Sequence, residues 1–226
     1  MIRVVGAANR WRHRAAIEAH HRIRHEIFVG ERGWHELARP DGREIDAFDG
    51  PDAIYVLAMA GAEVTGGFRL CPTTAPHMLS EVFPHLVTNG PLPRGDHVLE
   101  WTRLFVARDH RSGRTYFELL AALQSLCLHA GIREVTGVIE SWWLPRFHEA
   151  GFAVRPLGLP QMVAGQPTLA IAIAIDRAAL ARVRELGHLR PPPPLASPPL
   201  AASGGEGASP FMTDTQPAPQ PGRPGS

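Results

Sequence analysis

Three charged side chains interrupt apolar segments of this sequence, and they are the first candidates for chemistry. Arg69 stands within one predicted strand, and Glu100 and Arg103 stand within another. An unpaired guanidinium inside a sheet would be costly, so these arginines need acidic partners. Asp46 and Asp49, three residues apart in the preceding loop, are suitable partners, as is Glu100. The pattern predicts a buried network of acids and arginines.

Arg24, Phe28 and Trp34 lie on and just after the first predicted helix. Each by itself has a purely structural explanation, as a surface ion pair or a ring in the core. Beside the acid–arginine network, however, two aromatic rings suit a zwitterionic ligand with a flat ring and a cationic centre. S-adenosylmethionine is such a ligand, because its sulfonium can sit against aromatic faces.

A basic turn follows the strand that carries Glu100. Residues 108–114 read Arg-Asp-His-Arg-Ser-Gly-Arg and lead into an amphipathic helix. Free backbone N–H groups and the helix dipole favour an anion at such a junction, and Arg111 and Arg114 add full charges. The turn predicts an anion site, although a solvated loop explains the turn alone equally well.

The elements that must position these residues follow from hydrophobic periodicity and turn signals. Strands are predicted at residues 1–6, 54–60, 64–70, 98–106, 135–139, 152–154 and 169–175. Helices are predicted at residues 14–29, 78–83, 142–150 and 177–186, and one more includes residues 117–128. Strands between isolated helices indicate an α/β (α+β) three-layer sandwich, in which helices flank a central mixed sheet.

A change in composition marks a domain boundary near residue 189. Half of the 22 prolines lie in the last 36 residues, among Ser, Ala and Gly. Such a segment cannot bury enough apolar surface to offset its ordering entropy. We expect a folded domain at residues 1–188 and a disordered tail at 189–226.

Composition also excludes several classes of protein. A net charge of +1, without a long basic run, argues against a nucleic-acid partner. The longest apolar run, residues 169–175, is too short to span a bilayer, and the N-terminus lacks the apolar region of a signal peptide. Cys71 and Cys127 form no disulfide framework. We expect a cytoplasmic protein that contacts neither membrane nor nucleic acid.

Metal sites and nucleophilic triads have little support. His21 and His25 share one helical face but have no evident third ligand, so we expect no metal. Neither cysteine stands in a recognisable nucleophile setting.

The spaced residues resemble the LuxI-type acyl-homoserine-lactone synthases. The matching positions are Arg24, Phe28, Trp34, Asp46, Asp49, Arg69, Glu100 and Arg103, and the stretch Arg69-Leu-Cys-Pro-Thr-Thr also agrees. Order and spacing agree over roughly residues 1 to 180, and eight positions in register are a specific match. The resemblance implies a fold like the Gcn5-related N-acetyltransferases (GNAT), with splayed central strands that admit a pantetheine arm.

The resemblance also implies a reaction. An acyl group passes from an acyl thioester to the amine of S-adenosylmethionine, lactonisation follows, and methylthioadenosine leaves. The product, an N-acyl-homoserine lactone, serves quorum sensing. Glu100 would be the general base, through a water, with Arg103 beside it, and no cofactor is expected beyond the two substrates.

Further roles follow from the same resemblance. Arg24, Phe28, Trp34, Asp46, Asp49, Arg69 and Arg103 would bind S-adenosylmethionine. Phe105, Val106, Ala107, Arg108, Arg111 and Arg114 would meet the acyl donor, with backbone N–H groups of residues 105–107 holding the thioester oxyanion. Trp101, Trp142 and Trp143 would wall the acyl pocket, although packing of a helix on the sheet explains the last two equally well.

The acyl donor is expected to be acyl-coenzyme A. The segments Arg39-Pro-Asp-Gly-Arg-Glu, Ser80-Glu-Val-Phe-Pro-His-Leu and Trp142-Trp-Leu-Pro-Arg-Phe-His resemble a subgroup that uses acyl-coenzyme A to make branched-chain or aryl homoserine lactones. Acyl carrier protein is the alternative donor, but few lysines and no basic patch beyond the turn are available to dock it. The apolar Ile139 and acidic Glu140 favour a donor without a 3-oxo group.

Two other functions remain open from the sequence. A GNAT-type N-acyltransferase for another small amine would share the central strand, turn and helix, but it would not need the aromatic and acidic residues upstream. A non-enzymatic sensor of thioesters or nucleosides would bind without turnover.

Overall fold

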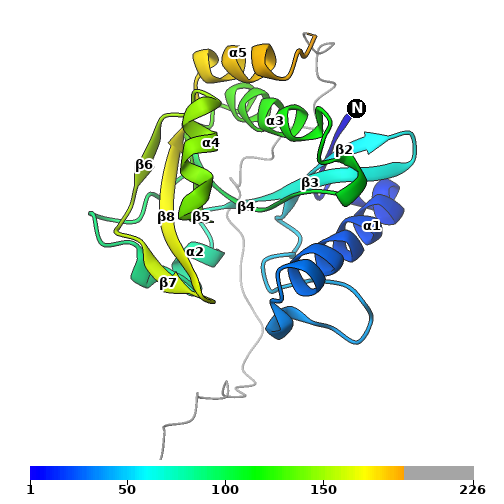
Figure 1. Ribbon diagram of the computed structural model, residues 1–226, viewed down its shortest axis with the longest axis horizontal. Helices are drawn as coiled ribbons and strands as arrows, with labels where there is room; N and C mark the ends of the chain where they lie inside the picture. The colour runs from blue at the N-terminus through cyan, green and yellow to red at the C-terminus, as the bar shows by residue number, and fades with distance from the viewer. Residues whose placement is uncertain (191–226) are drawn as a thin grey trace, which may run out of the picture.

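The chain folds around one mixed β-sheet, seen in a computed structural model that describes residues 1–190 (Figure 1). The strands are β1 (Ile2–Val5), β2 (Ile54–Ala60), β3 (Glu63–Pro72), β4 (Val98–Val106), β5 (Glu134–Glu140), β6 (Val154–Pro156), β7 (Gln161–Val163) and β8 (Gln166–Ala174). Their order is β1-β2-β3-β4-β5-β8-β6, with β7 also paired to β8. Within residues 1–190, β4 and β5 form the one parallel pair.

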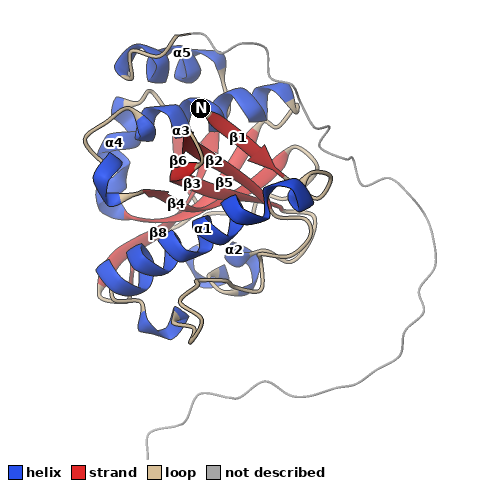
Figure 2. Ribbon diagram, turned by 90° about the vertical axis from the view of Figure 1, so that its right-hand side faces the viewer, coloured by secondary structure: helices blue, strands red, loops and turns tan. Residues whose placement is uncertain are grey.

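Helices cover both faces of this sheet, as Figure 2 shows. They are α1 (Arg14–Arg24), α2 (Met78–Glu81), α3 (Thr115–His129), α4 (Leu144–Glu149) and α5 (Arg177–Leu186). Helices α3, α4 and α5 enclose the largest core with Phe68 and Trp101, and α1 closes a second core around Tyr55 and Phe105. The predicted three-layer sandwich is confirmed.

The two parallel strands separate partway along their length. β4 and β5 are in register over Val98–Glu100 and Glu134–Thr136, yet both strands continue for several residues beyond this pairing. Backbone groups on the facing edges are therefore no longer joined past Glu100 and Thr136. The splayed sheet expected from the family resemblance is present, and the divergence leaves room between the strands.

A β-bulge in β4 redirects the side chains that follow Glu100. Gly67 of β3 pairs with Phe105 and Arg69 pairs with Thr102, so two residues of β4 oppose one residue of β3. Arg103 lies in the bulge with a φ of 57°. In a regular strand, residues three apart point to opposite faces. The bulge lets Glu100 and Arg103 serve the same face.

The first helix and the last hairpin differ from the predictions. The helix expected at residues 14–29 is α-helical to Arg24 and continues as a π-helix, η2 (His25–Glu31). The strand β7 was not predicted, because its turn to β8 uses Ala164 and Gly165 at positive φ rather than an Asn-Gly or Asp-Gly pair. Strand β6 lies at Val154–Pro156, two residues beyond the prediction.

Three expectations concern the chain as a whole. The predicted tail falls almost wholly outside the described residues, so it stays a prediction. Within residues 1–190, no helix is both long and apolar enough to cross a bilayer. Cys71 and Cys127 are buried and unpaired with each other, as expected of small core residues.

Candidate active site

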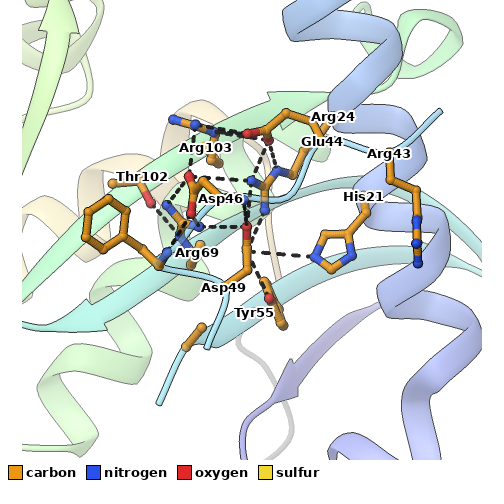
Figure 3. A network of polar contacts seen from close by, with 12 residues as sticks. His21, Arg24, Arg43, Glu44, Asp46, Asp49, Tyr55, Arg69, Thr102 and Arg103 are labelled. Atoms are coloured by element: carbon orange, nitrogen blue, oxygen red, sulfur yellow. Dashed lines mark hydrogen bonds and ion pairs between the residues drawn. The ribbon is translucent and has the colours of Figure 1, made fainter. Parts of the chain in front are cut away.

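Three acids and three arginines meet beneath the loop that precedes β2 (Figure 3). Arg24 comes from α1, Arg69 from β3 and Arg103 from the bulge in β4. The loop contributes Glu44, Asp46 and Asp49. Three positive and three negative groups balance, which is what a buried charged cluster requires.

Each acid in this network bridges two arginines. The carboxylate of Asp49 accepts two hydrogen bonds from Arg24, at 2.8 and 3.0 Å, and lies 3.0 Å from Arg69. Asp46 accepts from Arg69 at 2.5 and 3.0 Å and from Arg103 at 2.9 Å. Glu44 accepts from Arg24 and, at 3.0 Å, from Arg103. The predicted acid–arginine network is thus present.

Burial and charge act against each other in these acids. Burial alone would raise the pKa of Asp49, but the His21 ring, 3.7 Å away, and the charge of Arg24 outweigh it and lower that pKa. Burial likewise opposes ionisation of Glu44, yet Arg103 and Arg24 hold its pKa below the usual range. Asp49 and Glu44 are therefore ionised at neutral pH.

Glu100 lies apart from this network and is fully buried. Its two carboxylate oxygens accept the backbone N–H groups of Met78 at 3.0 Å and Leu79 at 2.5 Å, at the start of α2. The prediction that Glu100 pairs with an arginine is wrong. The strand directs the Glu100 carboxylate toward α2, where backbone N–H groups bind it. Burial raises the pKa of Glu100, and these hydrogen bonds and the charge of His77 offset that only in part.

Phe28 and Trp34 stack on each other with ring centroids 5.2 Å apart and an interplanar angle of 13°. Phe28 lies in the π-helix η2, whose wider turn precedes the loop that carries Trp34. The guanidinium of Arg103 lies 5.6 Å from the centre of the Phe28 ring. The aromatic pair and the charged network therefore form one wall.

A cavity of about 760 Å³ joins these features. Phe28, Trp34, Asp46 and Arg103 line one end of it. The other end is lined by residues of β4, β5, β8 and the segment around α4, which include Trp101, Thr136, Ile171, Trp143 and Phe147. Glu100 is among the lining residues as well. The charged, aromatic end of the cavity thus opens directly into the apolar end. The Glu100 carboxylate belongs to the lining of this joined cavity.

Comparison with known proteins identifies the family of this chain. Residues 9–183, more than half of the chain, match the autoinducer synthase family. The chain belongs to that family. The isovaleryl-homoserine lactone synthase of Bradyrhizobium diazoefficiens is 50% identical over 180 residues, which cover 80% of this chain and 82% of the relative.

Solved structures agree with this assignment. The CoA-dependent acyl-homoserine lactone synthase BjaI, solved with SAM and isopentyl-CoA, aligns at 48% identity with a TM-score of 0.81, covering 84% of this chain and 90% of BjaI. Escherichia coli ElaA, at 14% identity and a TM-score of 0.54, covers 76% of this chain and 97% of its own and shares the fold alone. The predicted family, its synthase activity and the GNAT-like fold are confirmed.

In this autoinducer synthase, the residues expected to bind S-adenosylmethionine fall into two groups. Phe28, Trp34, Asp46 and Arg103 line the cavity. Arg24, Asp49 and Arg69 lie behind them and contact the lining residues through the ion-pair network. The second group is placed to fix the first rather than to touch a ligand.

The residues expected to meet the acyl donor lie beyond the cavity wall. Phe105 packs in the core under α1, and the Ala107 N–H donates to Thr65 O at 2.9 Å. The Ala107 N–H is thus not free to hold an oxyanion. Successive N–H groups of a strand point to opposite edges, so the neighbouring Val106 N–H faces the side of β5.

The basic turn of this synthase is held by an acid that the sequence did not single out. Glu31, at the end of η2, accepts from Arg108 at 3.2 Å and from Arg111 at 2.7 Å. Arg114 instead contacts Glu118, one helical turn along α3. Two of the three predicted anion-binding arginines therefore share one carboxylate.

The three tryptophans expected around the acyl group are not equivalent. Trp101 and Trp143 line the cavity. Trp142 lies on the outer face of Trp143, stacked with a centroid distance of 4.6 Å, and is 44% exposed. Trp142 therefore supports the wall from outside.

Sequence reasoning missed two charged residues of the site. Glu44 bridges Arg24 and Arg103 but was not among the predicted acidic partners. Arg32, on the cavity wall, donates to both oxygens of Glu140 at 2.8 and 2.9 Å. Neither partner is near in sequence, so spacing gave no signal.

No group of potential metal ligands occurs within residues 1–190.

Proposed function

We propose that this synthase transfers an acyl group from acyl-coenzyme A to the α-amine of S-adenosylmethionine and then closes the lactone. The products are coenzyme A, methylthioadenosine and an N-acyl-homoserine lactone. The observation that carries the proposal is that one cavity has an aromatic, charged end and an apolar end, with Glu100 in its lining. One compartment suits a charged nucleoside, and the other suits an acyl chain.

The charged end has the chemistry that S-adenosylmethionine requires. The stacked Phe28 and Trp34 offer ring faces to an adenine or a sulfonium. Asp46 and Arg103 present one carboxylate and one guanidinium to the ammonium and carboxylate of the amino-acid part of the substrate. Both are held from behind by ion pairs, so their positions are fixed before the ligand arrives.

The apolar end suits an acyl chain that lies between the separated strands. Trp101, Trp143 and Phe147 give it aromatic walls, and the Trp143 and Phe147 rings stack 5.7 Å apart. Rigid aromatic walls favour a short or branched chain over a long flexible one. The relative BjaI was solved with isopentyl-CoA, which supports acyl-coenzyme A as the donor class.

The first half-reaction needs a base. The α-amine of S-adenosylmethionine is protonated at neutral pH and cannot attack until it loses a proton. Glu100 is buried, faces the cavity and has a raised pKa, so it accepts a proton more readily than an ordinary carboxylate. The free amine then attacks the thioester carbon, and the thiolate of coenzyme A leaves.

The second half-reaction is intramolecular. The substrate carboxylate attacks its own γ-carbon, the lactone ring closes, and the carbon–sulfur bond to methylthioadenosine breaks. A bent substrate held in the cavity has a high effective molarity, so positioning supplies much of the rate. The network around Asp46 and Arg103 provides that positioning.

The experiment that tests the proposal mixes purified protein, S-adenosylmethionine and a panel of acyl thioesters. The panel holds isovaleryl-, butyryl-, octanoyl-, 3-oxohexanoyl- and aryl-coenzyme A, with isovaleryl-acyl carrier protein as the matched carrier control. We expect an acyl-homoserine lactone and methylthioadenosine in equal amounts from a short, branched or aryl coenzyme A donor. Preference for the carrier-protein donor would overturn the donor class. Acylation of other amines without lactone would indicate a general N-acyltransferase.

A further inference from the structure

Thr136 is the residue beside Glu100 on the neighbouring strand. The two Cα atoms are partners in the last register pair before β4 and β5 separate. Paired residues of adjacent strands point to the same face of the sheet. Thr136 also pairs with Ala172 of β8, and Ala172 packs with Leu79, whose N–H donates to Glu100. The Thr136 side chain and the Glu100 carboxylate therefore share one face.

The hydroxyl of Thr136 has no hydrogen-bond partner within residues 1–190, although the residue is only 1% exposed. Two buried threonines on other strands do have one: Thr65 donates to Ala58 O at 3.2 Å, and Thr168 donates to Gln166 O at 3.0 Å. Burying an unpaired hydroxyl costs about 1–3 kcal/mol, so an unpaired hydroxyl beside a candidate base calls for an explanation. Thr136 lines the cavity, so a partner can come from there.

We propose that Thr136 is a positioning residue for Glu100, and that its hydroxyl holds the water through which Glu100 takes the proton of the substrate amine. This inference rests on the proposed function. A bridging water needs two or more polar partners in a closed site. The Glu100 carboxylate and the Thr136 hydroxyl face the same space without touching each other, and the substrate amine supplies the third partner.

The proton moves from the substrate ammonium to Glu100 through the water. The substrate ammonium gives one proton to the water while the water gives one proton to the Glu100 carboxylate. A neutral amine, a water and a neutral carboxylic acid result. After the amine has attacked the thioester, its nitrogen is positively charged and gives up its second proton, which goes to the coenzyme A thiolate as the carbon–sulfur bond breaks. The neutral Glu100 then releases the first proton to solvent, which restores the carboxylate. No oxidant or further reactant is needed.

Thr136→Val removes the hydroxyl and keeps the shape of the side chain. We expect kcat to fall about tenfold to a hundredfold, within the range of assisted proton transfer, while the Kd for S-adenosylmethionine changes little. Thr136→Ser restores the hydroxyl and should recover kcat to within about threefold of the parent, on the scale of one lost methyl group. Thr65→Val, which removes a buried hydroxyl outside the cavity, is the matched control and should leave kcat unchanged.

The pH profile separates positioning from packing. The charged or titratable groups around Glu100 are His77 before α2, and Arg69 and Cys71 on β3, and they remain in each variant. Loss of the bridging water removes a hydrogen bond to the ionised carboxylate, so the acid limb of kcat should move to higher pH in Thr136→Val and return in Thr136→Ser. An active Thr136→Val with an unmoved profile would overturn this inference alone. So would equal loss in the Val and Ser variants. A parent protein that makes no lactone would instead overturn the proposed function.

Discussion

At the scale of single residues, the groups that hold the cavity-lining side chains in place are distinct from the group proposed to take up the proton. Arg24 and Arg69 are completely buried and do not line the cavity, whereas Asp46 and Arg103 do. Glu100 receives only backbone N–H groups and retains a raised pKa. An acid inside the arginine network would be a poor base, because its pKa would be low. The separation of Glu100 from the network is therefore what makes it usable.

Removal of Arg24 should destabilise the protein more than removal of a surface arginine. Arg24→Met leaves Asp49 and Glu44 buried beside fewer positive charges, and breaking a buried pair in this way costs about 3–5 kcal/mol. Urea unfolding measures this loss. Arg43→Met is the matched control, because Arg43 also contacts two carboxylates, Asp41 and Glu18, but near the surface. Similar losses in both variants would contradict a structural role for the network.

The same network predicts how stability depends on pH. The pKa values of Asp49 and Glu44 are lower in the folded chain than in the unfolded one. Their contribution is therefore complete above the unfolded pKa values of about 3.9 and 4.3 and is lost as pH falls below them. Glu100 has the opposite sign, because its raised pKa makes its contribution decline as pH rises above about 4.3. Urea unfolding at pH 7, 5 and 3 should show a fall in the free energy of unfolding between pH 5 and 3. A constant value would count against the assignment.

At the scale of elements, the π-helix η2 connects the ends of the two separated strands. Its last residue, Glu31, contacts Arg108 and Arg111 just after β4, and the next residue, Arg32, contacts Glu140 at the end of β5. Arg32 also lies 5.7 Å from the Trp34 ring and 5.9 Å from the Trp142 ring. The segment that carries the aromatic pair is thereby tied to both strands.

Glu31→Gln should improve binding of the acyl donor. In the free protein Glu31 neutralises Arg108 and Arg111, which are the arginines expected to meet the donor phosphates. Without that charge, KM for acyl-coenzyme A should fall about threefold, the scale of a surface ion pair, with KM for S-adenosylmethionine unchanged. Steady-state kinetics at two salt concentrations measures this. Glu185→Gln, which breaks the Arg182 pair on α5, controls for charge. An unchanged or higher KM in Glu31→Gln would place the phosphates elsewhere.

At the scale of the whole molecule, periodicity predicted the elements and spacing predicted the network. The bounds of β2 and β4 match the prediction, because their apolar runs end at clear turn residues. The bulge at Arg103 could not be predicted, since no glycine or proline marks it. The contacts Glu31–Arg108 and Arg32–Glu140 join residues 77 and 108 positions apart, so they depend on tertiary structure alone. Residues close together in the sequence determine the helices and strands, whereas the site depends on how these elements are paired and packed in the folded chain.

The central claim is that Glu100 deprotonates the amine in a cavity that binds both substrates. The most direct measurement compares the parent and Glu100→Gln for S-adenosylmethionine affinity, by calorimetry, and for lactone formation, by mass spectrometry. We expect the Kd of the variant to stay within about threefold of the parent, because Glu100 makes no ion pair with the ligand-holding network, while turnover falls at least about a hundredfold. Full turnover in Glu100→Gln would contradict the claim.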